Sequence, residues 1–264
     1  MMSKILAIAR ITVKAELRNK LIYILLAIAL LFLFMARGCA PAKINIEKGL
    51  ISADQITQAG MLFTFNCILF WGLSLCGLLA MNAMPRELDE ETIVLTITKP
   101  VKRSWFLAGK FLGTFFIVFI NLIALTVGFA LFFYLRSGTF DPRIFAVLAA
   151  ATPNFILVIS LVFLLSLVLP RAIGALLTLG IYATSLWLSV LFFFEKVRAY
   201  WEPSLPTRML HYALPQLGGV HLYALSMMSD AFPSSMGMWS LIDIAAYLII
   251  IWAAMLLVFQ RKAL

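Results

Sequence analysis

The apolar stretch FLAGKFLGTFFIVFINLIALTVGFALFFYL, residues 106–135, decides the fold of this 264-residue chain. Its length exceeds the roughly 20 residues that a helix needs to cross about 30 Å of hydrocarbon. Lys110, near its start, is its only charged residue. In lipid a segment must satisfy its own backbone hydrogen bonds, which a helix does. We therefore expect a membrane-spanning helix here, tilted or with a protruding end because of its length.

Similar apolar segments recur along the chain. They cover Leu21–Ala36, Gly60–Met81, Ile144–Leu169, Ile173–Phe194 and Leu241–Phe259. A composition that is 63% hydrophobic and 12% charged excludes a soluble domain of this size. Barrel strands would alternate in hydrophobicity over about ten residues, and the chain shows no such alternation. The sequence predicts an all-α integral membrane protein: residues 1–20 form an interfacial segment, and residues 21–264 form a domain of six transmembrane helices.

The distribution of basic residues predicts the orientation of these helices. Thirteen of the 21 Lys and Arg residues fall on the same side of the membrane as the N-terminus, and eight fall on the other side. We therefore expect both termini to be cytoplasmic, in a cell membrane such as the bacterial inner membrane. The net charge of +9 follows largely from this bias, so we expect no nucleic-acid partner.

The N-terminal segment is basic and amphipathic. One face of a helix over residues 3–20 would carry Ile5, Leu6, Ala9, Val13 and Leu17, with Lys4, Lys14 and Arg18 roughly opposite. This pattern predicts a helix on the cytoplasmic surface with its apolar side in lipid. The alternative is a positively charged flank that only orients the first span.

The predicted spans contain few polar residues. Those present are mainly amides and hydroxyls, at Asn66, Asn121, Asn154, Thr178, Ser185 and Ser189, and we interpret them as packing contacts between helices. No Asp, Glu, Lys, Arg or His lies deep within a predicted span: Asp243 lies near the end of one, and Lys110 near the start of another. Ion-coupled transporters normally place such residues inside the bilayer, so this pattern argues against one. An intramembrane hydrolase would need a histidine at membrane depth, and neither histidine falls in a predicted span.

Both histidines, His211 and His221, lie in the outer segment 195–240. We expect one or two short helices there, dipping into the membrane interface. Several methionines share this segment, and thioether with imidazole suits copper(I), so a metal site at His211 and His221 is a hypothesis. Flexible methionines that line an interfacial helix are the favoured interpretation, because no paired Met or His spacing marks a site.

A concentration of charge lies between the second and third spans, in MPRELDEETIVLTITKPVKRSWFLAGKFLG, residues 84–113. Acidic residues at its start and basic residues before Arg103 complement a helix dipole, and Pro100 would end that helix. Ile93 and Ile97 lie one turn apart and would give it an apolar face suited to a groove on a partner. The alternation of apolar residues fits a strand equally well, and a solvated loop is a further alternative.

This segment resembles the signature of the ABC-2 family, the type-2 ABC exporter permeases. The resemblance is carried by Glu87, Glu90, Glu91, Thr92, Lys99, Pro100, Val101 and Arg103, followed by Gly109-Lys110-Phe111-Leu112-Gly113. The family often has a glycine where this chain has Glu91. The order of the remaining segments, with an amphipathic N-terminal helix, six spans and a larger outer segment before the last span, also agrees with the family.

The resemblance implies a function and partners. Residues 84–104, with Ile93 and Ile97 on the contact face, would form the coupling element that docks on an ATP-binding cassette subunit. The sequence shows no P-loop pattern, so we expect ATP and Mg²⁺ only in that separate subunit and no enzyme activity in this chain. Six spans are half a transporter, so a second copy or a related permease is expected, surrounded by membrane lipids. An amphipathic or lipid-like cargo is favoured only weakly, and the substrate stays open.

Overall fold

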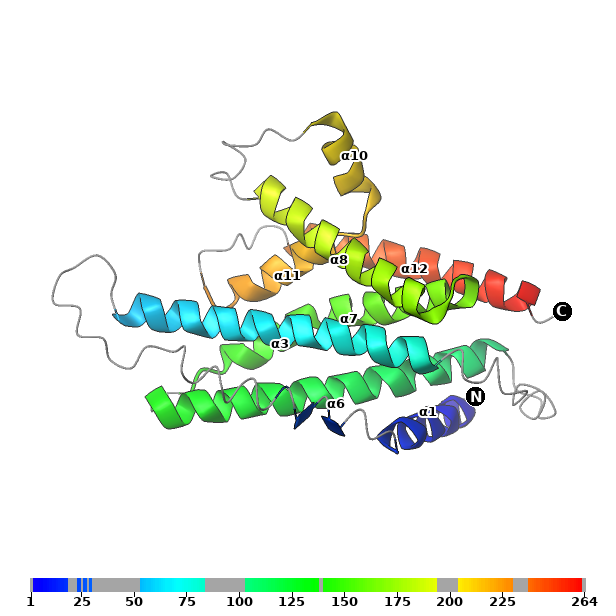
Figure 1. The fold of residues 1–264 in the computed structure, drawn as a ribbon, viewed down its shortest axis with the longest axis horizontal. Coiled ribbons are helices and arrows are strands. Elements are labelled where there is room, and N and C mark those ends of the chain that lie inside the picture. The colour runs from blue at the N-terminus through cyan, green and yellow to red at the C-terminus, as the bar shows by residue number, and fades with distance from the viewer. Residues whose placement is uncertain are drawn as a thin grey trace.

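The computed structural model describes residues 2–18, 23–24, 26–27, 29, 53–83, 103–137, 140–193, 204–229 and 237–262. The helices in these ranges are α1 (Met2–Leu17), α3 (Ala53–Ala83), α6 (Arg103–Ser137), α7 (Arg143–Val168), α8 (Arg171–Phe193), α10 (Leu205–Ala213), α11 (Leu217–Ser226) and α12 (Gly237–Lys262) (Figure 1). Among the described residues there is no strand, so the prediction of an all-α fold is confirmed for them.

Five of these helices are long and apolar enough to cross a membrane. The spanning parts are Ala59–Ala83, Ser104–Leu135, Arg143–Val168, Ala172–Phe193 and Gly237–Phe259. They confirm five of the predicted spans, with ends that differ by a few residues. The remaining predicted span, Leu21–Ala36, lies almost wholly outside the described residues, so the total of six stays a prediction.

Helix α7 is the centre of the bundle. It packs against α3, α6, α8, α11 and α12, and it passes through Pro153 without interruption. Its buried side chains are mostly branched and aromatic, among them Val147, Leu157, Ile159 and Phe163. A helix that is apolar on nearly every side belongs inside a bundle, because each of its faces must meet another apolar surface. The neighbouring helices are thereby held around one shared core.

Polar residues in the spans divide into two groups. Thr64, Asn121 and Thr178 bond the carbonyl oxygen four residues earlier in their own helix, which satisfies a side chain in an apolar setting. Asn66 and Asn154 instead reach another helix. The second group confirms the interpretation of these residues as contacts between helices, whereas the side chains of the first group bond within their own helix.

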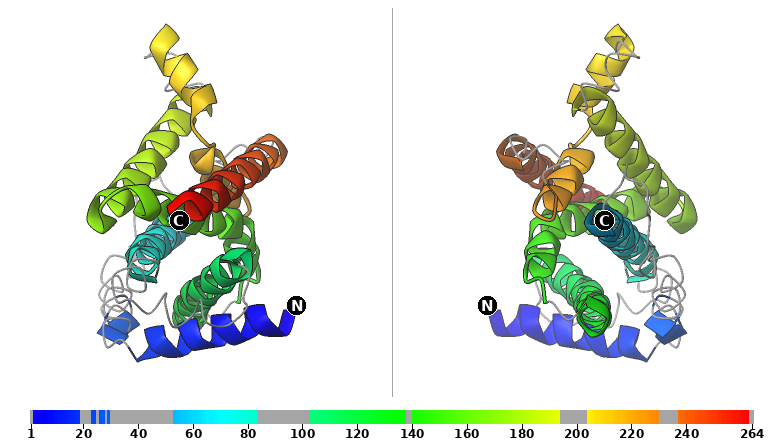
Figure 2. Two further views of the ribbon diagram at one scale, coloured as in Figure 1. Left: turned by 90° about the vertical axis from the view of Figure 1, so that its right-hand side faces the viewer. Right: turned by 90° about the vertical axis from the view of Figure 1, so that its left-hand side faces the viewer.

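Two short elements depart from the bundle direction. Figure 2 shows α1 lying crosswise beneath the long helices, and α1 packs on α6. Helix α10 projects from the side of the bundle, whereas α11 packs among α7, α8 and α12. The N-terminus, the end of α3, the start of α6 and the end of α12 all lie at one end of the bundle (Figure 1). The prediction of one or two short helices in the outer segment is confirmed, but α11 is buried in the bundle.

Candidate functional site

The predicted coupling residues fall outside the described part of the chain. These are Glu87, Glu90, Glu91, Thr92, Ile93, Ile97, Lys99 and Pro100. Arg103 begins α6, and its side chain is likewise outside the described residues. The structure does describe both flanks of this segment, α3 up to Ala83 and α6 from Arg103 onward.

A buried lysine joins these two flanks. The Lys110 side chain, 8% exposed, donates a hydrogen bond from Nζ to the carbonyl oxygen of Ala83 at 3.4 Å. Its ammonium group also lies 5.9 Å from the ring centroid of Phe106. A cation at the end of a helix interacts favourably with the exposed carbonyl groups of the last turn. The end of α3 and the second turn of α6 are therefore tied together at the base of the charged segment.

Helix α1 packs on these same turns of α6, at two glycines. A methyl group at Gly109 would lie 2.7 Å from Cβ of Ile8 and 3.0 Å from the carbonyl oxygen of Ile5. A methyl group at Gly113 would lie 2.6 Å from Cβ of Thr12. Two glycines four residues apart let helix backbones approach closely, as in helix pairs of membranes. We call this region, with Ile5, Ile8, Ala9 and Thr12 against Gly109 and Gly113, the α1–α6 contact.

The α1–α6 contact corrects the predicted orientation of the amphipathic helix. Ala9 and Thr12 are buried against α6, and Ile8 faces it, so part of the apolar side packs on protein and not in lipid. Leu6 and Leu17 of the predicted face stay exposed. The hydrophobic pattern located the helix correctly, but the glycine pair on α6 selects which side of it is covered.

A second concentration of contacts surrounds the connection between α10 and α11. Most of the hydrogen bonds to its backbone polar groups are buried or half-buried, and in an apolar setting each such group needs a partner. Helix α12 supplies three side chains from one face: Tyr247 donates to the carbonyl oxygen of Ala213 at 2.8 Å, Asp243 accepts from the Gln216 N–H at 2.8 Å, and Ser240 donates to the Gln216 side chain at 3.2 Å. Asp243 thus lies at the positive N-terminal end of α11.

Helices α7 and α8 bond the other side of this connection. Ser185 of α8 donates to the carbonyl oxygen of Pro215 at 2.7 Å and accepts from the Gly218 N–H at 3.1 Å. Asn154 of α7 donates to the carbonyl oxygen of Leu217 at 2.9 Å. Gly218 is required because a methyl group there would lie 2.5 Å from Cα of Leu186. We call residues 213–218, with these partners on α7, α8 and α12, the α11 junction.

One turn further along α11, His221 links three helices. Its Nδ1 accepts a hydrogen bond from the Tyr182 hydroxyl of α8 at 2.8 Å, and its Nε2 donates to Oδ1 of Asn66 of α3 at 2.7 Å. The amide oxygen can only accept, so the neutral ring carries its proton on Nε2. Helix α11 is not one of the candidate spans, and burial lowers the pKa of His221 to about 4. This side chain is therefore neutral at physiological pH.

The other histidine occupies an aromatic setting. His211 stacks on Phe192 with ring centroids 4.2 Å apart, and Phe193 lies edge-on at 5.8 Å. Burial lowers the pKa of His211, and the carboxylate of Asp243 opposes that shift. Within the described ranges no group of three His, Cys, Asp or Glu side chains is arranged to hold a metal ion. Because both ring nitrogens of His221 are already bonded, the arrangement gives the copper hypothesis no support.

Sequence reasoning missed the set Asn66, Tyr182 and His221. It placed His221 in an outer segment and used that position against intramembrane chemistry, whereas the structure buries the ring inside the bundle with 2% exposure. A signal was present, because the surrounding residues 217–225 are almost entirely apolar. A histidine in such a stretch needs a polar partner, and the amide of Asn66 in an equally apolar helix was a candidate.

The α11 junction has a structural role. Its side chains bond the backbone groups between α10 and α11, and the junction holds α11 between α7, α8 and α12. Fold and site together define an all-helical protein with integral membrane character. No family model matches the chain, and no curated protein is significantly similar to it in sequence.

Proposed function

We propose that this chain is the membrane-spanning permease subunit of an ATP-binding cassette exporter. In this proposal residues 84–104 dock on a separate nucleotide-binding subunit, which binds ATP and Mg²⁺. The proposal rests on the resemblance of this segment to the ABC-2 signature, on the membrane character of the helices and on the construction of the segment's base.

The observation that carries the proposal is the Lys110 tie between α3 and α6. A docking segment transmits movement only if its two flanks are held together and connected to the bundle. The hydrogen bond from Lys110 to Ala83 holds the flanks, and the α1–α6 contact lies on the same turns of α6. A force on residues 84–104 would therefore reach α3, α6 and α1 together.

The proposed cycle follows from this construction. ATP-driven association of two nucleotide-binding subunits moves the docked segments, and each segment pulls on the joined ends of α3 and α6. A second copy of the chain, or a related permease, completes the pathway between the two bundles. The α11 junction holds α11 between α7, α8 and α12, so that these helices respond as a unit.

Affinity purification of the tagged full chain from native membranes in mild detergent tests the proposal. We expect an ATPase subunit to co-purify with the parent chain and to be lost from a Glu90→Lys/Glu91→Lys variant, because reversed charges oppose docking. Asp141→Lys is the control, since Asp141 precedes α7 at the opposite end of the bundle. It should retain the ATPase.

Two results would contradict the proposal. One is a chain that emerges without any ATPase under several gentle extractions. The other is loss of the ATPase from both the coupling variant and Asp141→Lys, which would indicate a general folding defect and not a docking site.

Ion-coupled transport is a second candidate, and the position of His221 favours it. A titratable ring inside the bundle, bonded to Tyr182 and Asn66, is the kind of group on which a proton could travel. In that case His221→Gln would abolish a proton-dependent flux, and no ATPase would co-purify with the parent chain. In the exporter proposal the same variant lowers stability and leaves ATP-dependent transport coupled.

A further inference from the structure

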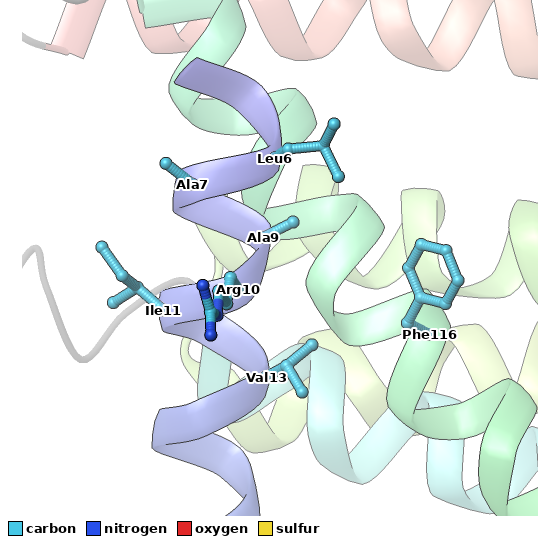
Figure 3. A pocket seen from close by; sticks show the side chains of 7 residues that line it. All are labelled: Leu6, Ala7, Ala9, Arg10, Ile11, Val13 and Phe116. Carbon is cyan, nitrogen blue, oxygen red and sulfur yellow. The ribbon is translucent and has the colours of Figure 1, made fainter. Parts of the chain in front are cut away.

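An apolar groove of about 730 Å³ lies beside the α1–α6 contact. Its lining consists of Leu6, Ala7, Ala9, Arg10, Ile11, Val13 and Phe116. In Figure 3, Leu6, Ala9 and Val13 lie on the side of α1 that faces Phe116, whereas Ala7 and Ile11 point to the other side. The groove therefore has walls from two helices and one basic side chain at its edge.

The groove follows from how α1 crosses α6. The backbones are closest at Gly109 and Gly113, and the crosswise helix diverges from α6 beyond them. Phe116 lies about 4.5 Å further along α6 than Gly113, at 1.5 Å per residue. Because neither helix covers the space there, Leu6 is 59% exposed and Phe116 is 49% exposed.

The groove continues as an apolar stripe along α6. Exposed side chains follow at helical spacing, namely Phe116, Ile120, Ile123, Val127 and Leu131. They extend over about 22 Å, which exceeds the roughly 15 Å of hydrocarbon in one leaflet. All of them belong to the candidate span Ser104–Leu135. A stripe of this kind inside a span fits an acyl chain and not a water-soluble partner.

One cation lies at the edge of the groove. Arg10 lines it and is exposed, whereas Lys14, one turn later on α1, is not part of the lining. Lys4 is directed elsewhere, with its ammonium group 6.0 Å from the ring centroid of Trp105. A guanidinium beside an apolar groove complements a phosphate that carries acyl chains.

We propose that this groove is a binding site for an anionic phospholipid. The phosphate lies beside Arg10, and one acyl chain enters past Leu6 and Val13 and follows the α6 stripe from Phe116. The site does not depend on the exporter function, because it is built from α1, α6 and the membrane alone. A bound lipid would fill the space that the crossing helices leave and would fix α1 at the membrane surface.

Photolabelling of the full chain in phosphatidylcholine vesicles tests the site. The vesicles contain a small fraction of phosphatidylglycerol or phosphatidylcholine with a photoreactive group in one acyl chain, and mass spectrometry locates the adducts. We expect the phosphatidylglycerol probe to label the peptide around Phe116 preferentially. An Arg10→Gln variant should reduce this labelling by about tenfold, because it removes the charge-assisted contact to the phosphate.

The matched control is Lys4→Gln, which removes one charge from the same helix at a side chain that lies near Trp105 and does not line the groove. It should leave labelling near Phe116 within about twofold of the parent chain. Equal labelling by the two probes, or equal loss in both variants, would overturn the proposal. So would chain-to-chain cross-links from a photoreactive residue at position 116 in place of lipid adducts, because they would identify a second copy as the occupant.

Discussion

The α1–α6 contact and the α11 junction both depend on glycines, yet they hold their helices in different ways. At the α1–α6 contact, Gly109 and Gly113 bring α1 against α6 through packing. At the α11 junction, Gly218 brings α11 against α8, and side chains from α7, α8 and α12 bond the backbone as well. Two helices held by close packing alone can move against each other. A helix whose backbone is hydrogen-bonded to its neighbours can move much less. We infer a movable element near the charged segment and a fixed one beside α8 and α12.

The largest expected effect comes from filling the α11 junction. Gly218→Ala should lower the free energy of unfolding by about 3 kcal/mol, because the added methyl group meets the backbone of α8, which cannot rotate away. Unfolding of the full chain in detergent, followed by tryptophan fluorescence, measures the change. Gly180→Ala on α8 is the control, since a methyl group there meets no atom within 4 Å. Equal stability of the two variants would show that the junction is loosely packed.

The pH dependence of stability should be nearly as large. The pKa of His221 is about 4 in the folded chain against an ordinary value of 6.5, so the unfolded chain binds more protons between these values. Stability is fully present above pH 6.5 and is lost as the pH falls towards 4, by roughly 3 kcal/mol. His221→Gln, which can still bond Tyr182 and Asn66, should flatten the curve. An unchanged slope in this variant would assign the effect to other groups.

A smaller loss is expected when one bonded side chain is removed from the junction. Ser185→Ala removes one of the two hydrogen bonds to the Pro215 carbonyl oxygen, which still accepts from the Leu217 N–H. It also takes the side-chain partner from the N–H of Gly218, and we expect a cost of about 2 kcal/mol. The adjacent Thr184→Ala is the matched control, because Thr184 is exposed to the outside of the bundle and bonds only its own helix at Gly180. Thr184→Ala should change the unfolding free energy by less than about 0.5 kcal/mol. Similar losses in both variants would contradict a special role for Ser185.

The difference between the two regions also explains what the sequence can predict. The spans of α6, α7 and α8 can be predicted from the sequence, because length and apolar composition determine where a spanning helix lies. Their predicted ends differ from the observed ones by a few residues. The amphipathic N-terminal helix can be predicted in the same way. Which side of it packs on α6 cannot be predicted, because that depends on Gly109 and Gly113, about a hundred residues further along the chain.

The contacts of the α11 junction could not be predicted from the sequence. Nothing near Ser185 or Asn154 in the sequence identifies Pro215 or Leu217 as a partner, since each bond joins residues brought together only by the packed bundle. Gly218-Gly219 and the isolated His221 indicated that this region is unusual, but they did not predict that α11 is buried in the bundle. The coupling residues 84–102 lie outside the described ranges, so their predicted role rests on the resemblance and on the Lys110 tie beneath them.

The smallest global effect is expected at the α1–α6 contact, and it distinguishes the two regions most clearly. A Gly109→Ala/Gly113→Ala variant should displace α1, because both methyl groups meet Ile8 and Thr12. The free energy of unfolding of the bundle should fall by no more than about 1 kcal/mol, since α1 contributes little to the core around α7. Amide hydrogen exchange should rise in α1 and stay unchanged in α7 and α11. Gly77→Ala, where a methyl group meets no atom within 4 Å, should leave exchange in α1 unaltered. Loss of protection throughout the bundle in the double variant would mean that α1 is part of the core, and the distinction between a movable and a fixed contact would fail.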